Sequence, residues 1–293
     1  MSGQFYCKRL IPSEVTYLEL LDIADMQCRG FEEDEMVKVL RGPRYAVNPR
    51  YTVLLQGIQD PRERLNEMVS WTKNYQILVH AAARVLHLIL LGRGNDVYIA
   101  VDRATDKPAG LAIWEYPAHM QDDLEAKAGR KGLFYTFHKL WIQLKYAIPE
   151  FLLKVQRIHP FDNHLSTKLK KERLEHLYPK TKAEELIGLS QEKLEKAFYP
   201  LELMVHLKHL VISPDYRLRG LGKKLLSYSL ENIPNVPAPL SKSVSGPQKL
   251  YLVSSPDGFA LYQKTGWLFT GRILQPSFLP PHACDNSLMI LTR

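Results

Sequence analysis

The strongest chemical signal in the sequence is a short basic segment with two glycines, at residues 217–222. Its sequence is Arg-Leu-Arg-Gly-Leu-Gly, and it lies between the apolar residues 203–212 and a helix-like run. At the start of a helix, the first backbone N–H groups have no partners inside the helix, and the helix dipole adds partial positive charge. Gly220 and Gly222 leave this backbone open to a ligand. The segment is therefore predicted to bind a phosphate or pyrophosphate group.

Two other phosphate-binding motifs do not fit this spacing. A P-loop requires Gly, four residues and then Gly-Lys-Ser/Thr, which this segment lacks. A dinucleotide-binding fingerprint requires a third glycine three residues after Gly222, where the chain has Leu225. A glycine-rich turn with incidental basic residues is the alternative to a pyrophosphate loop.

The spacing Arg217-x-x-Gly220-x-Gly222 resembles the Arg/Gln-x-x-Gly-x-Gly/Ala signature of the GNAT superfamily of acyl-CoA N-acyltransferases. Residues 251–267 resemble its second motif, in which a strand precedes a helix with a tyrosine and then Gly-Phe/Trp; here these are Tyr262 and Gly-Trp267. The form Ser-Pro-x-Gly before Leu-Tyr is similar to the branch common in filamentous fungi. The resemblance covers residues 207–267 and implies acetyl-CoA, or another acyl-CoA, as the acyl donor.

The resemblance also implies which residues bind this donor. The backbone of the strand before the loop would pair with the pantetheine arm, and the loop would hold the pyrophosphate. Ser255 stands where many relatives have an Asn that touches the pantetheine, and its hydroxyl can make one hydrogen bond there. The implied cofactor-binding residues are Leu210, Val211, Ile212, Arg217, Leu218, Arg219, Gly220, Leu221, Gly222, Lys223 and Ser255.

Two residues are the implied catalytic pair. Tyr262 matches the tyrosine that protonates the leaving thiolate in the family, and a phenol pKa near 10 suits this role. His206 stands where several relatives carry a catalytic Glu, and an imidazole can accept a proton from the acceptor ammonium. Because side chains alternate along a strand, His209 is expected on the opposite face. Glu115 is a further candidate for binding the acceptor ammonium, and which of the three acts as base stays open.

Helices and strands must position these motifs, and the periodicity of apolar residues predicts where these elements lie. Helices are expected over residues 15–26, with Ser13 as a possible cap, over 32–40, and over 62–86 after Pro61. A β-hairpin is expected from strands 96–102 and 111–116, with a turn at 103–110. A helical insertion at about 122–198 follows, and then strand 203–212 and helix 220–231. A surface loop at 234–247, strand 250–253, helix 259–264 and two strands within 267–292 complete the chain.

The resulting fold class is α/β (α+β), with a GNAT-type mixed, mostly antiparallel sheet flanked by helices and a helical insertion between the third and fourth strands. One domain is expected over residues 1–293, with its cofactor-binding core at about 201–270.

The amino-acid composition limits the kinds of ligand and partner that are expected. The net charge of +8 and pI near 9.2 suit an anionic ligand, but no aromatic-basic module supports nucleic-acid binding. Three cysteines without metal-like spacing, together with His159, His164 and His176, make no recognisable metal site. The N-terminus lacks a signal-peptide pattern and no long apolar run occurs, so a soluble, cytoplasmic protein without a membrane partner is expected.

The predicted activity is acetyl-CoA-dependent N-acetylation of a primary amine by direct attack in a ternary complex. A small-molecule acceptor is expected, because the helical insertion would cover the substrate side. The alternatives are a protein or peptide N-acetyltransferase and a catalytically inactive CoA-binding regulatory module.

Overall fold

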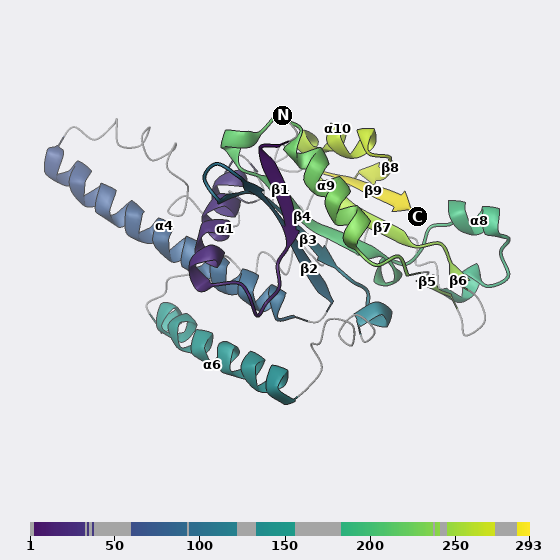
Figure 1. Ribbon diagram of the computed structural model, residues 1–293, viewed down its shortest axis with the longest axis horizontal. Helices are drawn as coiled ribbons and strands as arrows, with labels where there is room; N and C mark the ends of the chain where they lie inside the picture. Colours follow the sequence, from purple (N-terminus) through teal and green to yellow (C-terminus); the bar gives the residue numbers. More distant parts are fainter. Residues whose placement is uncertain are drawn as a thin grey trace.

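A seven-stranded sheet with the order β1-β2-β3-β4-β7-β9-β8 runs through the computed structural model of the chain (Figure 1). The structure describes residues 3–32, 34, 37, 60–92, 94–121, 133–155, 183–236, 238–240, 245–272 and 286–293. The strands of this sheet are β1 Phe5–Arg9, β2 Asn95–Asp102, β3 Lys107–Glu115, β4 Val205–Ile212, β7 Lys249–Ser254, β8 Leu268–Arg272 and β9 Ser287–Thr292.

Neighbouring strands in this sheet are antiparallel except β4 and β7, which are parallel. The predicted hairpin is confirmed as β2 and β3, although β3 begins at Lys107, inside the segment predicted as a turn. Strand β1 has no counterpart among the predicted elements, and it pairs with β2 from Phe5↔Asp102 to Arg9↔Tyr98. A five-residue strand at the edge of a sheet carries too little periodicity to be recognised in the sequence.

Two pairs of helices cover the sheet, one pair on each face (Figure 1). Helices α1 (Tyr17–Gly30) and α4 (Pro61–Leu90) pack on one face, and α9 (Leu221–Asn232) and α10 (Pro256–Lys264) on the other. The cap of α1 is Thr16, whose hydroxyl accepts the Glu19 N–H, so the predicted cap Ser13 is wrong. Thr16 lies at the position where its oxygen can reach the third N–H of the helix.

The sheet is buried on both faces, and each face has its own core. Leu111 and Ile113 of β3 pack toward α1 and α4, whereas Ala112 and Trp114 pack toward α9 and α10. The strand directions and the helices on both faces confirm the predicted mixed, mostly antiparallel sheet flanked by helices.

A helical insertion joins β3 to β4, as the sequence predicts. Its described parts are α6 (Leu133–Val155), η2 (Ala183–Leu186), α8 (Gln191–Lys196) and η3 (Leu201–Leu203). The predicted surface loop 234–247 contains a two-residue strand pair, β5 (Ala238–Pro239) and β6 (Ser245–Gly246). The predicted helix 32–40 and the three insertion histidines fall almost entirely outside the described residues. No described helix is long and apolar enough to span a bilayer.

Candidate functional site

The parallel strands β4 and β7 pair over only part of their length. Val205, His206 and Leu207 pair with residues 250–252, and the described pairing between the two strands ends there. On its other side, β4 stays paired with β3 up to Ile212. Residues 208–212, which include the predicted Leu210, Val211 and Ile212, therefore present one backbone edge that no described strand covers.

A β-bulge in β4 decides where the histidines point. Ile113 pairs with His209 and Trp114 with Leu207, so Lys208 is an extra residue without an opposite partner. Opposed residues share a face of the sheet, and His206 lies opposite Glu115 on the same face as His209. The expectation that the two histidines lie on opposite faces is therefore wrong, because the bulge shifts the alternation by one residue.

His206 lies in a small cluster of polar and aromatic side chains. Its Nδ1 is 3.5 Å from a Glu115 carboxylate oxygen, and the Lys208 ammonium is 3.8 Å from the same oxygen. Its ring stacks on Tyr251 of β7 with 4.3 Å between centroids and almost parallel planes. The pKa of Tyr251 is raised by burial and by the Glu115 charge. The cluster thus joins β3, β4 and β7 at the point where β4 leaves β7.

His209 has a different environment, formed by helix α1. Its Nδ1 lies 3.1 Å from the Gln27 side-chain nitrogen, and its ring meets Phe31 edge-on at 5.5 Å. Burial first, and then the charges of Lys208 and His206, lower the pKa of His209 to about 4. His209 is therefore uncharged at neutral pH and is a weak proton acceptor.

The backbone of the predicted phosphate loop is tightly turned. After β4 comes the short helix η4 (Pro214–Tyr216), and then Leu218 and Gly220 both adopt left-handed backbone angles, with φ of 59° and 76°. A Cβ added at Gly220 would meet no described atom within 4 Å, so within the described part of the chain the backbone here is open. Gly220 is also the N-cap of α9, which confirms the predicted helix start.

The basic side chains of the loop do not all face one point. Arg217 donates to the Gly30 carbonyl at the end of α1, and Arg219 lies over the Tyr216 ring with 5.7 Å to its centroid. Lys224 donates to the Phe5 carbonyl, and Lys223 is exposed. Arg217 therefore tethers the loop to α1, a role that its charge alone does not predict.

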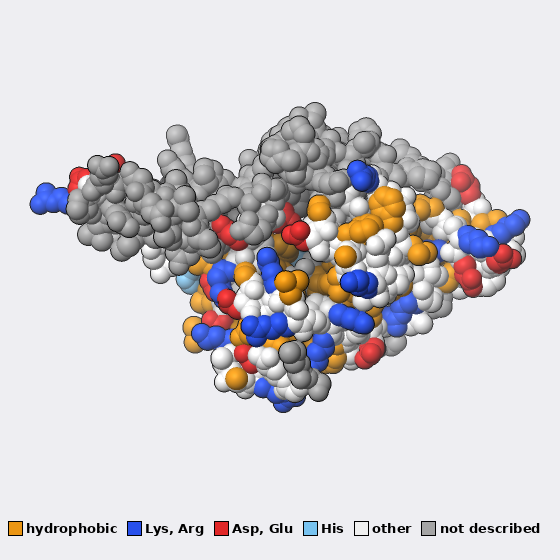
Figure 2. Space-filling model, turned by 90° about the horizontal axis from the view of Figure 1, so that it is seen from above, with side chains coloured by type: hydrophobic (Ala, Val, Ile, Leu, Met, Phe, Trp, Pro, Cys, Tyr) orange, Lys and Arg blue, Asp and Glu red, His pale blue; other side chains and the backbone are white. Residues whose placement is uncertain are grey.

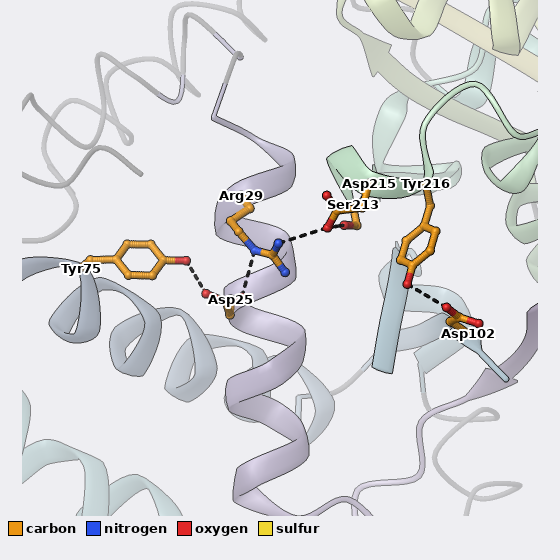
Figure 3. A network of polar contacts seen from close by, with 7 residues as sticks. All are labelled: Asp25, Arg29, Tyr75, Asp102, Ser213, Asp215 and Tyr216. Carbon is orange, nitrogen blue, oxygen red and sulfur yellow. Dashed lines mark hydrogen bonds and ion pairs between the residues drawn. The ribbon is translucent and has the colours of Figure 1, made fainter. Parts of the chain in front are cut away.

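The start of the loop is tied to strand β2. The Tyr216 hydroxyl donates a 2.8 Å hydrogen bond to Asp102 at the end of β2 (Figure 3). The pKa of Asp102 is held below its usual value by the Ala104 N–H and then by this hydroxyl. Asp102 therefore anchors η4 as a carboxylate at neutral pH.

The same end of the loop is also tied to α1 and, through it, to α4. Arg29 lies 3.0 Å from Asp25 and 3.3 Å from Asp215 of η4 (Figure 3). Asp215 also accepts a 3.4 Å hydrogen bond from Ser213, and Asp25 accepts one from Tyr75 of α4. Side chains from three other elements, β2, α1 and α4, therefore fix the position of one short turn.

Helix α10 carries Tyr262 on the opposite face of the sheet from His206. Tyr262 is buried against Trp267, edge-on at 6.1 Å, and burial raises its pKa above the usual value. Ser255 caps α10, and its hydroxyl accepts the Gly258 N–H at 3.4 Å. The Ser255 hydroxyl therefore stabilises the start of α10, in addition to the pantetheine contact that the family resemblance implies.

Sequence reasoning missed Gln27, Phe31, Lys208 and Tyr251 as members of this site. Tyr251 stands inside the second motif, but only the strand register brings it beside His206. Gln27 and His209 are 182 residues apart in the chain. No local pattern connects such pairs. Among the residues that the structure describes, no group of three or more His, Cys, Asp or Glu side chains is arranged to hold a metal ion.

No family model matches the chain, and no curated protein matches its sequence. Its fold is similar to those of solved acetyltransferases. One from Corynebacterium glutamicum, described as a histone acetyltransferase and related acetyltransferase, has 13% identity and a TM-score of 0.42, over 98% of this chain and 95% of that one.

Two other solved structures have a similar level of likeness. The spermidine N-acetyltransferase SpeG from Vibrio cholerae has 11% identity and a TM-score of 0.35, over 99% of this chain and 94% of that one. NAA60 from Arabidopsis thaliana, bound to a bisubstrate analogue, has 11% identity and a TM-score of 0.35, over 72% of this chain and 82% of that one. At these identities and TM-scores the likeness concerns architecture alone, and it transfers no activity to this chain.

Proposed function

We propose that this chain is an acetyl-CoA-dependent N-acetyltransferase that acts on a small primary amine. The observation that carries the proposal is the separation of β4 from β7 after Leu207, directly before an open, left-handed loop at the N-terminus of α9. An acyl-CoA has a pantetheine arm that can pair with an uncovered strand edge and a pyrophosphate that suits such a loop.

The described residues fit this donor. Leu218 and Gly220 are exposed, and no described atom lies within 4 Å of a Cβ added at Gly220. Lys and Arg side chains are scattered among apolar ones on the face where α9 and α10 begin (Figure 2). A surface of this mixed kind suits a ligand with both phosphates and an apolar arm. Bound acetyl-CoA would supply an acyl thioester that an amine can attack.

The two catalytic roles then fall to residues on opposite faces of the sheet. His206 is the better base, because the Glu115 carboxylate 3.5 Å away stabilises the imidazolium that forms when the ring accepts a proton. His209, with its pKa lowered to about 4, holds a proton too weakly for this role. Tyr262 keeps its Oη proton at neutral pH, since a phenol has an ordinary pKa near 10 and burial raises the pKa of Tyr262 further, and we assign this proton to the leaving thiolate.

The acceptor side favours a compact cationic amine. Glu115 is partly exposed and bears the negative charge of the cluster, and the Tyr251 and His206 rings lie beside it. A protonated amine is attracted by the carboxylate and by the faces of the aromatic rings. His206 is then positioned to make this amine neutral and nucleophilic.

The test is a thiol-release assay with acetyl-CoA and a panel of primary amines: polyamines, amino acids, arylalkylamines and short peptides with free N-termini. The expected result is turnover with at least one small cationic amine. Turnover with the peptides alone would make the chain a peptide N-acetyltransferase. Calorimetric binding of acetyl-CoA without any turnover would support the inactive CoA-binding module, and the absence of binding would refute the proposal as a whole.

Two matched variants test the assignment of His206 as the base. His206→Gln is expected to abolish the acidic limb of the pH profile of kcat/KM and to lower the rate, whereas His209→Gln should retain that limb. Both variants keep a polar side chain of similar length on the same face of the sheet. An identical pH profile for wild type and His206→Gln would exclude His206 as the base.

A further inference from the structure

Helix α6 carries a second apolar surface on the side that faces away from the protein core. Its inner side packs through Ile142 and Tyr146 against Leu91, at the end of α4. The helix lies at the margin of the fold, well separated from the sheet (Figure 1). Its outer side carries five large apolar side chains, each between 54% and 65% exposed: Phe137, Leu140, Trp141, Leu144 and Ile148.

These five residues form one continuous stripe. Their separations of three and four residues place them on a single helix face, and the successive 100° steps of an α-helix put that face opposite Ile142. A helix at the surface of a globular protein normally has polar side chains there. Contiguous exposed apolar surface of this kind marks an interaction site.

The charge of α6 favours an anionic occupant. The helix contains three lysines, Lys139, Lys145 and Lys154, and one acidic residue, Glu150, which give it a net charge of +2. Lys145 lies beside the stripe, about 80° around the helix from Phe137. A second copy of the chain would bring the same positive charges face to face in a symmetric pair. An anionic surface complements them.

We propose that α6 docks on the surface of an anionic phospholipid bilayer. The aromatic and aliphatic stripe would enter the boundary between headgroups and acyl chains, while Lys145 at its side extends toward lipid phosphates. The expectation of no membrane partner rests on the lack of a long apolar run, and a helix that lies in the interface needs no such run. The proposal is independent of the acyl-transfer activity.

The experiment is cosedimentation of the full chain with vesicles of phosphatidylcholine alone or with added phosphatidylserine. Wild type is expected to partition at least about tenfold more strongly onto the anionic vesicles, and added salt should weaken this binding. The double variant Trp141→Glu/Leu144→Glu should lower partitioning at least about tenfold, because it removes buried apolar area and adds two repelled charges. The matched control is Leu18→Glu, a 74% exposed leucine on α1, which should bind as wild type does.

Two further measurements complete the test. Nitroxide-labelled lipids should quench the tryptophan fluorescence of wild type, and Trp141→Phe should remove most of this quenching. An unchanged circular dichroism spectrum and an unchanged melting temperature would show that the charged variant is folded. Equal partitioning onto both kinds of vesicle, or wild-type partitioning of the double variant, would overturn the proposal. So would a wild-type dimer that the double variant dissociates, because the stripe would then bind a second copy.

Discussion

Replacement of Gly220 by alanine separates the ligand-binding role of the loop from its contribution to stability. Gly220 has a φ of 76°, and an L-residue in this left-handed region costs about 1–2 kcal/mol. The lower entropy of the unfolded alanine variant offsets about 0.4–1 kcal/mol of this cost. A net loss of about 1 kcal/mol in the free energy of unfolding is therefore expected, because the added Cβ meets no protein atom within 4 Å.

The chain offers a matched control at Gly188. This residue lies between η2 and α8, has a φ of 83°, and also has open space around an added Cβ. Gly188→Ala should therefore lower stability by about the same amount as Gly220→Ala. In a protein of this size the melting temperature would fall by about 2–4 °C in each variant.

Ligand binding should distinguish the two variants. A methyl group at Gly220 would stand where an anion approaches the backbone, and the loss of one hydrogen bond to a charged group costs about 1.5–3 kcal/mol. The Kd for acetyl-CoA, measured by titration calorimetry, should rise about ten- to a hundredfold in Gly220→Ala and stay unchanged in Gly188→Ala. Wild-type affinity in Gly220→Ala, together with the expected loss of stability, would refute the assignment of this loop to the pyrophosphate.

Three other outcomes are expected. Tyr262→Phe should lower kcat about a hundredfold or more with an unchanged Kd for acetyl-CoA, and an unaltered kcat in steady-state assays would remove its acid role. Tyr216→Phe removes the 2.8 Å hydrogen bond to Asp102 and should weaken acetyl-CoA binding severalfold by calorimetry; equal affinity would mean that this anchor does not position the loop. Because burial lowers the pKa of His209 from 6.5 to about 4, the unfolded chain binds a proton between these pH values that the folded chain does not, so stability should fall as the pH falls through this window. His209→Gln should flatten this dependence in urea unfolding, and parallel curves for the two proteins would contradict the cause given for the shift.

Much of the framework follows from local sequence. Pro61 predicts the start of α4, which begins at this residue with Asp60 as its cap. Apolar residues before a Gly-x-Gly segment predict a strand, a turn and a helix, and the chain forms β4, η4 and α9 there. These features depend on neighbours within one turn or one strand, where covalent spacing limits the possible partners.

The arrangement of the candidate site depends on contacts that are remote in sequence. His209 lies on the same face as His206 because of the bulge at Lys208, and a bulge has no residue pattern that alternation could show. Tyr251 reaches His206 through the register of two parallel strands, and Gln27 reaches His209 from helix α1. Each of these contacts is fixed by packing between separate elements.

The predicted phosphate loop shows both kinds of information in one place. The two glycines and the start of a helix are local properties, and the sequence by itself determined that a glycine-containing turn precedes α9. Only the tertiary structure decided that Arg217 binds the end of α1 and that Tyr216 and Asp215 anchor the turn to β2 and α1. The physical reason is that a charged side chain can reach many partners from one position, and the packing of the surrounding elements selects among them.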